Sequence, residues 1–291
     1  MNSPLDELLC RATREGWSTG HFNVSELDQM RAITKAAEEV KAPVLIGASE
    51  GERAHIGLEE IIALRDIFRK KYGIPIFLNA DHSKSVDTAL KAVDAGFDSV
   101  HIDLSEKTFE ENIQGTKAVV DYVRSKYLSV SLEGELGYLR GESKIQQEKL
   151  EVRKEDYTDP EKAHEFVERT GVDRLAVVVG NIHGISLDEP DLDIERIIHI
   201  RKTLPLDKTL VLHAGSGIPD VQIRAAIKAG IANIHINTDI RVAFVGALRK
   251  NLDLHPQEVA MYKLDSSAID AVRNIVKEKF ILFGSAHTMI A

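Results

Sequence analysis

Residues 74–82, IPIFLNADH, decide the fold: a short apolar run ends there in an aspartate and a histidine. Two later segments, residues 175–183 (LAVVVGNIH) and 210–213 (LVLH), also end in histidine. Each run has the length of a buried strand, and parallel strands closed into a barrel end at one common face. We therefore expect three imidazoles to meet there as the ligands of a catalytic zinc ion: His82, His183 and His213.

Short apolar runs alternate with longer amphipathic ones along the whole chain. The predicted strands are residues 20–24, 43–47, 76–79, 99–103, 128–133, 174–180, 209–213 and 233–237. The predicted helices are residues 26–40, 58–72, 85–95, 109–126, 160–170, 194–203, 219–229 and 240–251. Strands that are apolar on both faces and separated by helices indicate a covered parallel sheet. Eight such units favour a (β/α)8 TIM barrel, with residues 1–291 forming one domain.

Three features qualify this assignment. An open doubly wound sheet is the alternative, but no GxGxxG follows an early strand. Residues 134–157 form a long charged segment after the fifth strand, which we expect to be a mobile active-site loop. The chain beyond residue 252 is expected to add one or two helices, for dimer contacts or for covering the barrel.

Composition excludes several classes of protein. The net charge of -9 argues against binding to nucleic acid. No run approaches the roughly 20 apolar residues of a membrane span, and the N-terminus lacks a signal-peptide core. Cys10 is the only cysteine, so an intrachain disulfide is impossible and a cytoplasmic location is expected.

Carboxylates accompany the histidines. Asp81 precedes His82 at a strand end, where the chain turns, so we expect both side chains to reach the cleft. A carboxylate beside a metal can act as a general acid and base, although it can also serve only to orient a histidine. Three further carboxylates end strands and are expected to support the first metal or to bind a second: Asp103, Glu133 and Glu135.

Small residues precede two of the later helices. Residues 213–217 (HAGSG) and 237–239 (NTD) place free N–H groups and hydroxyls at helix N-termini, which suits a phosphate group. Helix capping explains Thr238 or Asp239 alone, but not the Gly-Ser-Gly run. No lysine is predicted at the catalytic end of a strand, which excludes a Schiff-base mechanism.

Eight segments in the same order as in a known family give the chain its resemblance to that family: GHFNVSELDQM (20–30), APVLIGAS (42–49), NADH (79–82), DAGFDSVHIDLSEKTFEENI (94–113), LEGELG (132–137), VVVGNIHGI (177–185), LVLHAGSGIP (210–219) and INTDIRVAF (236–244). In these segments the chain resembles the class II, zinc-dependent fructose-bisphosphate and tagatose-bisphosphate aldolases. The resemblance implies a TIM barrel that works as a homodimer or homotetramer on a phosphorylated ketose.

The resemblance also implies roles for single residues. Zinc would be held by His82, His183 and His213, with Asp81 as the general acid and base. An alternative metal position matches Asp103 and Glu135. A phosphate or a monovalent cation (Na⁺ or K⁺) matches Gly184, Gly215 and Ser216, and Thr238 matches a phosphate-binding threonine. Ser49 matches a contact to the far end of the substrate, and His235 and Asn237 complete the expected substrate site.

Three departures from the family pattern leave alternatives open. The loop glutamate that exchanges a proton on carbon falls at Ser143, so we assign that role to the adjacent Glu142 or to another residue. His235 stands where many members have asparagine, and Ala214 replaces a common glycine. Fructose 1,6-bisphosphate is the first substrate candidate. Tagatose 1,6-bisphosphate, another phosphorylated ketose, a non-catalytic binding barrel and a metal-dependent hydrolase are the alternatives.

Overall fold

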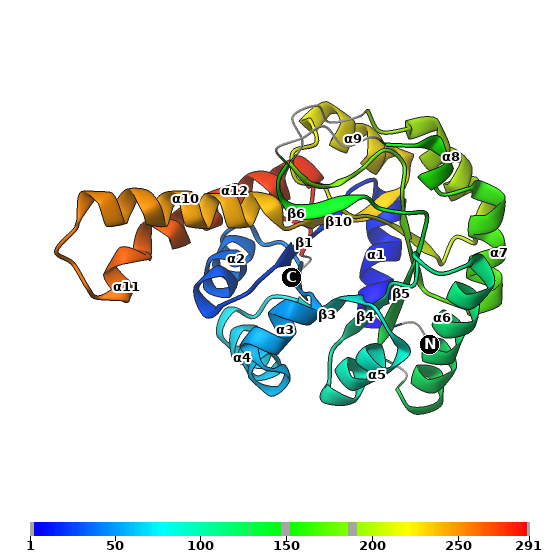
Figure 1. Ribbon diagram of the computed structural model, residues 1–291, viewed down its shortest axis with the longest axis horizontal. Helices are drawn as coiled ribbons and strands as arrows, with labels where there is room; N and C mark the ends of the chain where they lie inside the picture. Colours follow the sequence, from blue (N-terminus) through cyan, green and yellow to red (C-terminus); the bar gives the residue numbers. More distant parts are fainter. Residues whose placement is uncertain (1–2, 128, 147–151, 186–190, 290–291) are drawn as a thin grey trace.

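Eight parallel strands close into a barrel in the computed structural model, which describes residues 3–127, 129–146, 152–185 and 191–289. Their order around the ring is β1-β10-β9-β7-β5-β4-β3-β2, and helices surround them (Figure 1). The barrel strands are β1 (Thr19–Asn23), β2 (Val44–Ala48), β3 (Ile76–Ser83), β4 (Ser99–Ile102), β5 (Ser131–Leu136), β7 (Arg174–Val177), β9 (Thr209–Leu212) and β10 (Ile231–Ile236). The predicted barrel is thus confirmed, and chain-adjacent β/α units are neighbours throughout.

The covering helices agree with the predicted ones within three residues at each end. They are α2 (Leu27–Val40), α4 (Leu58–Tyr72), α5 (Val86–Ala95), α6 (Phe109–Lys126), α7 (Pro160–Thr170), α8 (Ile194–Thr203), α9 (Asp220–Ala229) and α10 (Thr238–Leu254). In the described part of the chain, no helix is both long and apolar enough to cross a membrane.

Five short or terminal elements were not predicted: α1 (Pro4–Glu15), α3 (Glu50–Ile56), β6 (Gly141–Ile145), η1 (Lys154–Asp156) and β8 (His183–Ile185). Helix α1 closes the end of the barrel where the strands begin, because Asp6 bonds to Ser131 at the start of β5. Its apolar face, including Leu5 and Leu9, packs beneath the barrel with Trp17. The opposite end is left free for a site.

The interior of the barrel is polar, which corrects the expectation that the strands are apolar on both faces. Arg174 is fully buried and pairs with Glu133 at 2.7 Å, while its Nε donates to the Ser131 hydroxyl at 3.0 Å. Alternate residues of a strand face opposite sides, so every second position supplies this interior. The intervening apolar residues, such as Leu132 and Leu175, belong to the layer between strands and helices.

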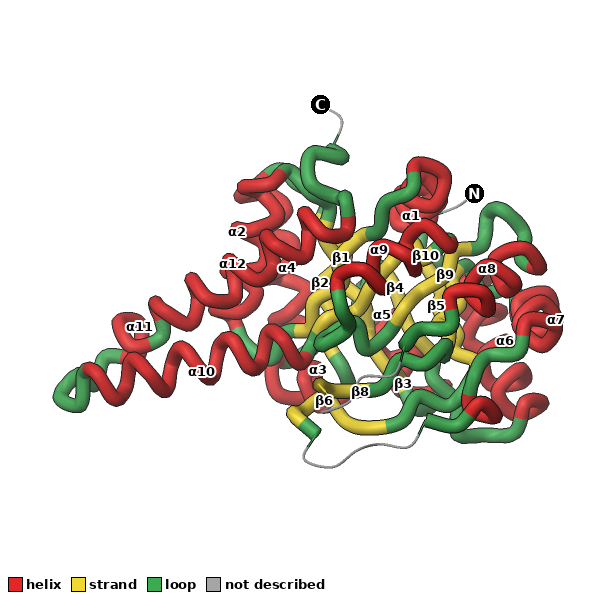
Figure 2. Tube along the Cα trace, turned by 90° about the horizontal axis from the view of Figure 1, so that it is seen from above, coloured by secondary structure: helices red, strands yellow, loops and turns green. Residues whose placement is uncertain are grey.

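Helix α10 and the C-terminal helices form an arm that leaves the barrel. The chain passes from α10 through α11 (Met261–Leu264) into α12 (Ser266–Phe283), which returns to pack on α2 (Figures 1 and 2). The predicted helices beyond residue 252 are therefore present. The tip of the arm exposes several large apolar side chains, among them Leu254, Val259 and Tyr262.

Candidate active site

A cavity of about 350 Å³ opens at the end of the barrel where the strands run into the following helices. Nearly all of the residues predicted to form the site line it: Asp81, Glu142, His82, His183, His213, Asp103, Glu135, Ser49, Gly184, Ser216, His235, Asn237 and Thr238. Gly215 does not line it. Its N–H donates to the carbonyl of His235 at 2.9 Å, and a side chain there would collide with Ile234, so this glycine serves close packing.

An irregularity in the pairing of β3 with β4 explains how the consecutive residues Asp81 and His82 both reach the cavity. The register between β3 and β4 shifts between Ala80 and Ser83, and His82 has φ +43°. Such a bulge re-aims side chains next to it, so the usual alternation of faces does not separate Asp81 from His82. Both side chains reach the cavity as expected, but through this irregularity inside β3 and not through a turn at its end, and the positive φ stores backbone strain at His82.

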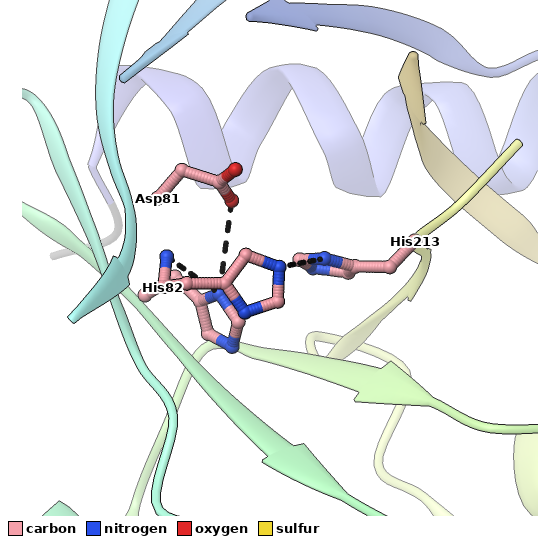
Figure 3. Close-up of side chains that lie close together, drawn as sticks. Asp81, His82 and His213 are labelled. Carbon is pink, nitrogen blue, oxygen red and sulfur yellow. Dashed lines mark hydrogen bonds and ion pairs between the residues drawn. The ribbon is translucent and has the colours of Figure 1, made fainter. Parts of the chain in front are cut away.

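His82 and His213 each turn one ring nitrogen toward the other. His82 Nε2 lies 3.1 Å from His213 Nδ1 (Figure 3). On the far side of each ring, His82 Nδ1 bonds to Asp103 Oδ2 at 2.7 Å, and His213 Nε2 bonds to Glu133 Oε1 at 2.6 Å. Because a carboxylate accepts, the hydrogen of each neutral ring is on the far nitrogen, and the two facing nitrogens both present lone pairs.

Two lone pairs at this distance repel unless a cation lies between them. Either one ring takes an extra proton, or a metal ion binds both nitrogens. Burial holds the pKa of His213 well below its usual range, so that ring stays neutral and able to bind metal. Burial also lowers the pKa of His82, but the carboxylates of Asp81 and Asp103 raise it overall, so the extra proton belongs to His82 and a bound metal ion would displace it. Carboxylates that orient the outer nitrogens of metal-binding histidines are a recurring arrangement. The donor set therefore fits a divalent cation.

His183 is the outermost of the three predicted ligands. Its ring centroid lies 5.2 Å from that of His82, and its backbone N–H donates to the carbonyl of Arg140. Burial and the neighbouring His82 lower its pKa to about 3, so the ring is neutral. Among the described residues, the groups whose ligand atoms already lie within 4.8 Å of one another include His82 and His213 but not His183.

Asp81 is held ionised at the inner edge of the cavity. Its carboxylate is 4% exposed, and Oδ2 accepts a hydrogen bond from Asn23 at 3.0 Å. The other oxygen faces His235 Nδ1 at 3.4 Å and has no hydrogen-bond partner. Burial alone would raise the pKa of Asp81, but the nearby His82, His101 and His235 hold it well below its usual range.

A second group of possible metal ligands surrounds the outer side of His82. Asp103 and Glu135 lie there as predicted, and His101 joins them, with its Nε2 3.3 Å from Glu135 Oε2. Sequence reasoning missed His101. The available signal was its position two residues before Asp103 in the predicted strand of residues 99–103, because alternate residues of a strand share a face.

The expectation that no lysine lies at this end of the barrel is wrong. Strand β3 continues to Ser83, four residues past its predicted end, and so Lys84 enters the cavity wall. Its ammonium group pairs with Asp103 Oδ2 at 2.6 Å. Although burial lowers the pKa of Lys84, the Asp103 carboxylate raises it overall, so the amine stays protonated and is no Schiff-base nucleophile.

The small polar residues gather where β9 and β10 end. The Ser216 hydroxyl accepts a hydrogen bond from the N–H of Asp239 at 3.1 Å, and Thr238 is the first residue of α10. The side-chain oxygen of Asn237 is buried without a hydrogen-bond partner. Hydroxyl groups and a helix N-terminus of this kind are suited to an anion.

Glu142 lies on the outer side of the cavity, in a segment of residues 137–146 that we call the strap. Strand β6 of the strap pairs with β8, which begins at His183. The Glu142 side chain is 75% exposed and pairs with Lys144 at 2.7 Å. The Ser143 carbonyl instead accepts a hydrogen bond from Arg241, which also lines the cavity. Part of the segment predicted as a mobile loop, residues 147–151, lies outside the described residues.

Known proteins resemble this chain in sequence and in architecture. The sequence matches the family described as fructose-bisphosphate aldolase class-II over residues 3–288. It is 36% identical over 280 residues to a sulfofructosephosphate aldolase of Alkalicoccus urumqiensis, covering 96% of this chain and 95% of that protein. It is also 36% identical over 286 residues to a probable fructose-bisphosphate aldolase of Bacillus subtilis, covering 97% and 98%. The solved YdjI aldolase of Escherichia coli K12 superposes with a TM-score of 0.83 at 32% identity, covering 99% of both chains.

Proposed function

Because this chain belongs to the class II fructose-bisphosphate aldolase family, whose members are generally metal-dependent lyases, we propose that it is a zinc-dependent aldolase. The proposed reaction is the reversible cleavage of fructose 1,6-bisphosphate to dihydroxyacetone phosphate and glyceraldehyde 3-phosphate. The observation that carries the proposal is the pair of facing nitrogens of His82 and His213, each backed by a buried carboxylate.

We assign the metal to His82, His183 and His213. A bound Zn²⁺ supplies a Lewis acid beside the carbonyl of the substrate and so stabilises the negative charge that develops as the carbon–carbon bond breaks. Asp103 and Glu133 fix the orientation of two of the rings from behind. Three imidazoles suit zinc, and they suit cobalt or iron as well.

Asp81 is proposed to move the proton at the C4 hydroxyl. Its unpartnered oxygen is available for that hydroxyl, and its low pKa keeps it in the carboxylate form that accepts a proton. During condensation the same oxygen returns the proton. Asn23 holds the second oxygen in place, and so the direction of the first is fixed.

The 1-phosphate is proposed to bind where Ser216 and Thr238 meet the N-terminus of α10, with Gly184 across the cavity. Lys84, Arg241 and Ser49 also line the cavity and are proposed to face the far end of the substrate. Glu142 is proposed to exchange the proton on carbon once the bound substrate draws the strap inward and releases it from Lys144.

A second candidate keeps this chemistry on another ketose. The relative named as acting on sulfofructose phosphate is as similar to this chain as the one named for fructose bisphosphate, at 36% identity each. The two cations at the far end, Lys84 and Arg241, suit either a phosphate or a sulfonate there. Tagatose 1,6-bisphosphate differs from fructose 1,6-bisphosphate only in the configuration at C4, so it is a third candidate substrate for the same reaction.

The arm supports a proposed homodimer or homotetramer. Val259 is 88% exposed and Tyr262 76% exposed at its tip. Burying large apolar side chains of this kind against a second copy of the chain would stabilise an oligomer. The proposal predicts a single oligomer in sedimentation analysis. Polar substitutions at these two positions should dissociate it, and a monomeric wild-type protein would contradict it.

Metal removal and a substrate panel test the proposed reaction. Protein stripped with a chelator should lose cleavage and regain it on addition of one Zn²⁺ per chain, while His213→Ala should bind no metal. Formation of dihydroxyacetone phosphate should then be compared for fructose 1,6-bisphosphate, tagatose 1,6-bisphosphate and sulfofructose 1-phosphate. Cleavage that persists without metal would overturn the proposal, and preference for another ketose would replace only its substrate.

A further inference from the structure

A second cavity, of about 550 Å³, lies beside the candidate active site. Ser105 and Tyr138 line both cavities and form the partition between them. The remaining walls come from the segment after β4, the end of β5, the short helix η1 and the first turns of α6, α7 and α8. We call this second cavity the basic pocket.

The basic pocket carries an excess of positive charge. Three exposed lysines come to it from three separate segments: Lys107, Lys154 and Lys162. Among the described residues, none of these lysines forms an ion pair with a carboxylate at 4.0 Å or less. Ammonium groups gathered around one hollow repel one another, and an anion inside it removes that repulsion.

Most of the other charged groups of the pocket already form hydrogen bonds or ion pairs within the protein. Arg196 bonds to Asp193 at 3.1 Å and to the carbonyl of Thr158. Asp159 caps α7 by accepting hydrogen bonds from two backbone N–H groups at 3.0 Å. Glu155 is the one further acid among the described residues of the lining, so the three lysines outnumber it. The whole chain, in contrast, has a net charge of -9.

Apolar and aromatic side chains form the rest of the wall. The Tyr157 ring lies 5.3 Å from the guanidinium of Arg196, and the Phe109 ring lies 5.9 Å from the ammonium of Lys162. Leu136 adds aliphatic surface beside them. A ligand that fills the pocket therefore needs an anionic group for the lysines and a ring or carbon skeleton for these side chains.

We propose that the basic pocket is a binding site for an organic phosphate, separate from the phosphate position of the catalytic reaction. Phosphate oxygens would pair with Lys107, Lys154 and Lys162, and the organic part would rest against Tyr157 and Phe109. This inference goes beyond the proposed aldolase activity and does not depend on it.

The pocket is tied to the strap, so a ligand there would also restrain the segment that carries Glu142. The N–H of Tyr138 donates to the carbonyl of Asp156 at 2.8 Å, and Arg140 pairs with the Asp156 carboxylate at 2.6 Å. Asp156 belongs to η1, the same short helix that supplies Lys154. Ligand binding should therefore slow hydrogen exchange of residues 138–145.

Calorimetric titration of the full-length protein tests the proposal with three probes: ADP, glucose 6-phosphate and inorganic pyrophosphate. The test variant is Lys154→Glu/Lys162→Glu, and the matched control is Lys228→Glu/Lys250→Glu, which reverses two exposed lysines elsewhere. At least one organic phosphate should bind to the wild type and the control, and at least about tenfold more weakly to the test variant. Preference for ADP or for glucose 6-phosphate identifies the organic part.

Two further measurements keep the result decisive. Ser216→Ala, at the phosphate position of the candidate active site, should leave binding to the basic pocket unchanged. Thermal unfolding must show that the test variant is folded. If it is not, the single variant Lys107→Glu takes its place in the titration. Equal binding by wild type and test variant would overturn the proposal, as would binding of pyrophosphate alone or of none of the probes.

Discussion

The two walls of the candidate active site are built in different ways. The inner wall, consisting of Asp81, His82, Asp103 and His213, is fixed by hydrogen bonds and ion pairs inside the barrel, with Glu133 behind His213. The outer wall is the strap, where Glu142 is 75% exposed and pairs only with a neighbouring lysine. The charged groups of the inner wall are thus positioned before substrate binds, whereas the strap is free to move when it binds.

The largest expected effect is at the inner wall. Asp81→Asn keeps the size of the side chain but cannot accept the C4 hydroxyl proton, so kcat should fall by about 10³-fold. Cleavage of fructose 1,6-bisphosphate, followed by a coupled assay of dihydroxyacetone phosphate, measures this loss. Zinc content should stay unchanged. A loss below tenfold would remove Asp81 from the proposed mechanism.

A smaller, selective effect is expected at the strap. Glu142→Gln should slow solvent exchange of the carbon-bound proton of dihydroxyacetone phosphate by about 10²-fold, because no other strap carboxylate replaces it. Deuterium incorporation followed by NMR measures the exchange. Glu106→Gln, at another glutamate of the cavity wall, is the matched control. If the control loses exchange and Glu142→Gln does not, Glu106 takes over the role.

The carboxylate behind His82 should affect metal affinity more than folding. Asp103→Asn removes the charge that holds both His82 and Lys84, and zinc affinity should fall by about 10- to 100-fold. Competition with a chromophoric chelator measures this. Asp87→Asn, which loses only an exposed pair with Lys91, should have wild-type affinity. An unchanged affinity in Asp103→Asn would show that Asp103 does not support the metal site.

The three histidines of the cavity could be predicted from sequence because barrel geometry makes the ends of successive strands neighbours in space. His82, His183 and His213 end or follow apolar runs, and the fold brings those ends to one cavity. The polar interior could not be predicted so readily. Arg174 and His101 sit in otherwise apolar strands, and only the pairing of strands shows that they face Glu133 and Glu135.

The outer wall was beyond sequence reasoning for a different reason. Strands β6 and β8 are short, and their paired residues are 40 and 42 positions apart in the chain, without a periodic pattern that would predict either strand. The predicted end of β3 is four residues early because polar residues from Asn79 onward end its apolar run, and the prediction therefore misses Lys84. Irregular backbone next to a site hides functional residues from pattern-based prediction.

The smallest expected effect concerns such irregular backbone at Ala214, directly after His213. Ala214 has φ +56°, in the left-handed region that disfavours any residue with a Cβ. Ala214→Gly removes that strain but adds freedom to the unfolded chain, and the net gain in free energy of unfolding should be about 0.5–1 kcal/mol. Urea unfolding followed by circular dichroism measures it.

Lys41→Gly is the matched control, because Lys41 ends α2 with φ +52° and does not line the cavity. Both variants should gain stability by a similar amount, and neither should change metal affinity if the strain is only a cost to folding. If Ala214→Gly weakens zinc binding while Lys41→Gly does not, the backbone at Ala214 is strained in order to aim His213. That result would add main-chain strain to the hydrogen bonds that fix the inner wall.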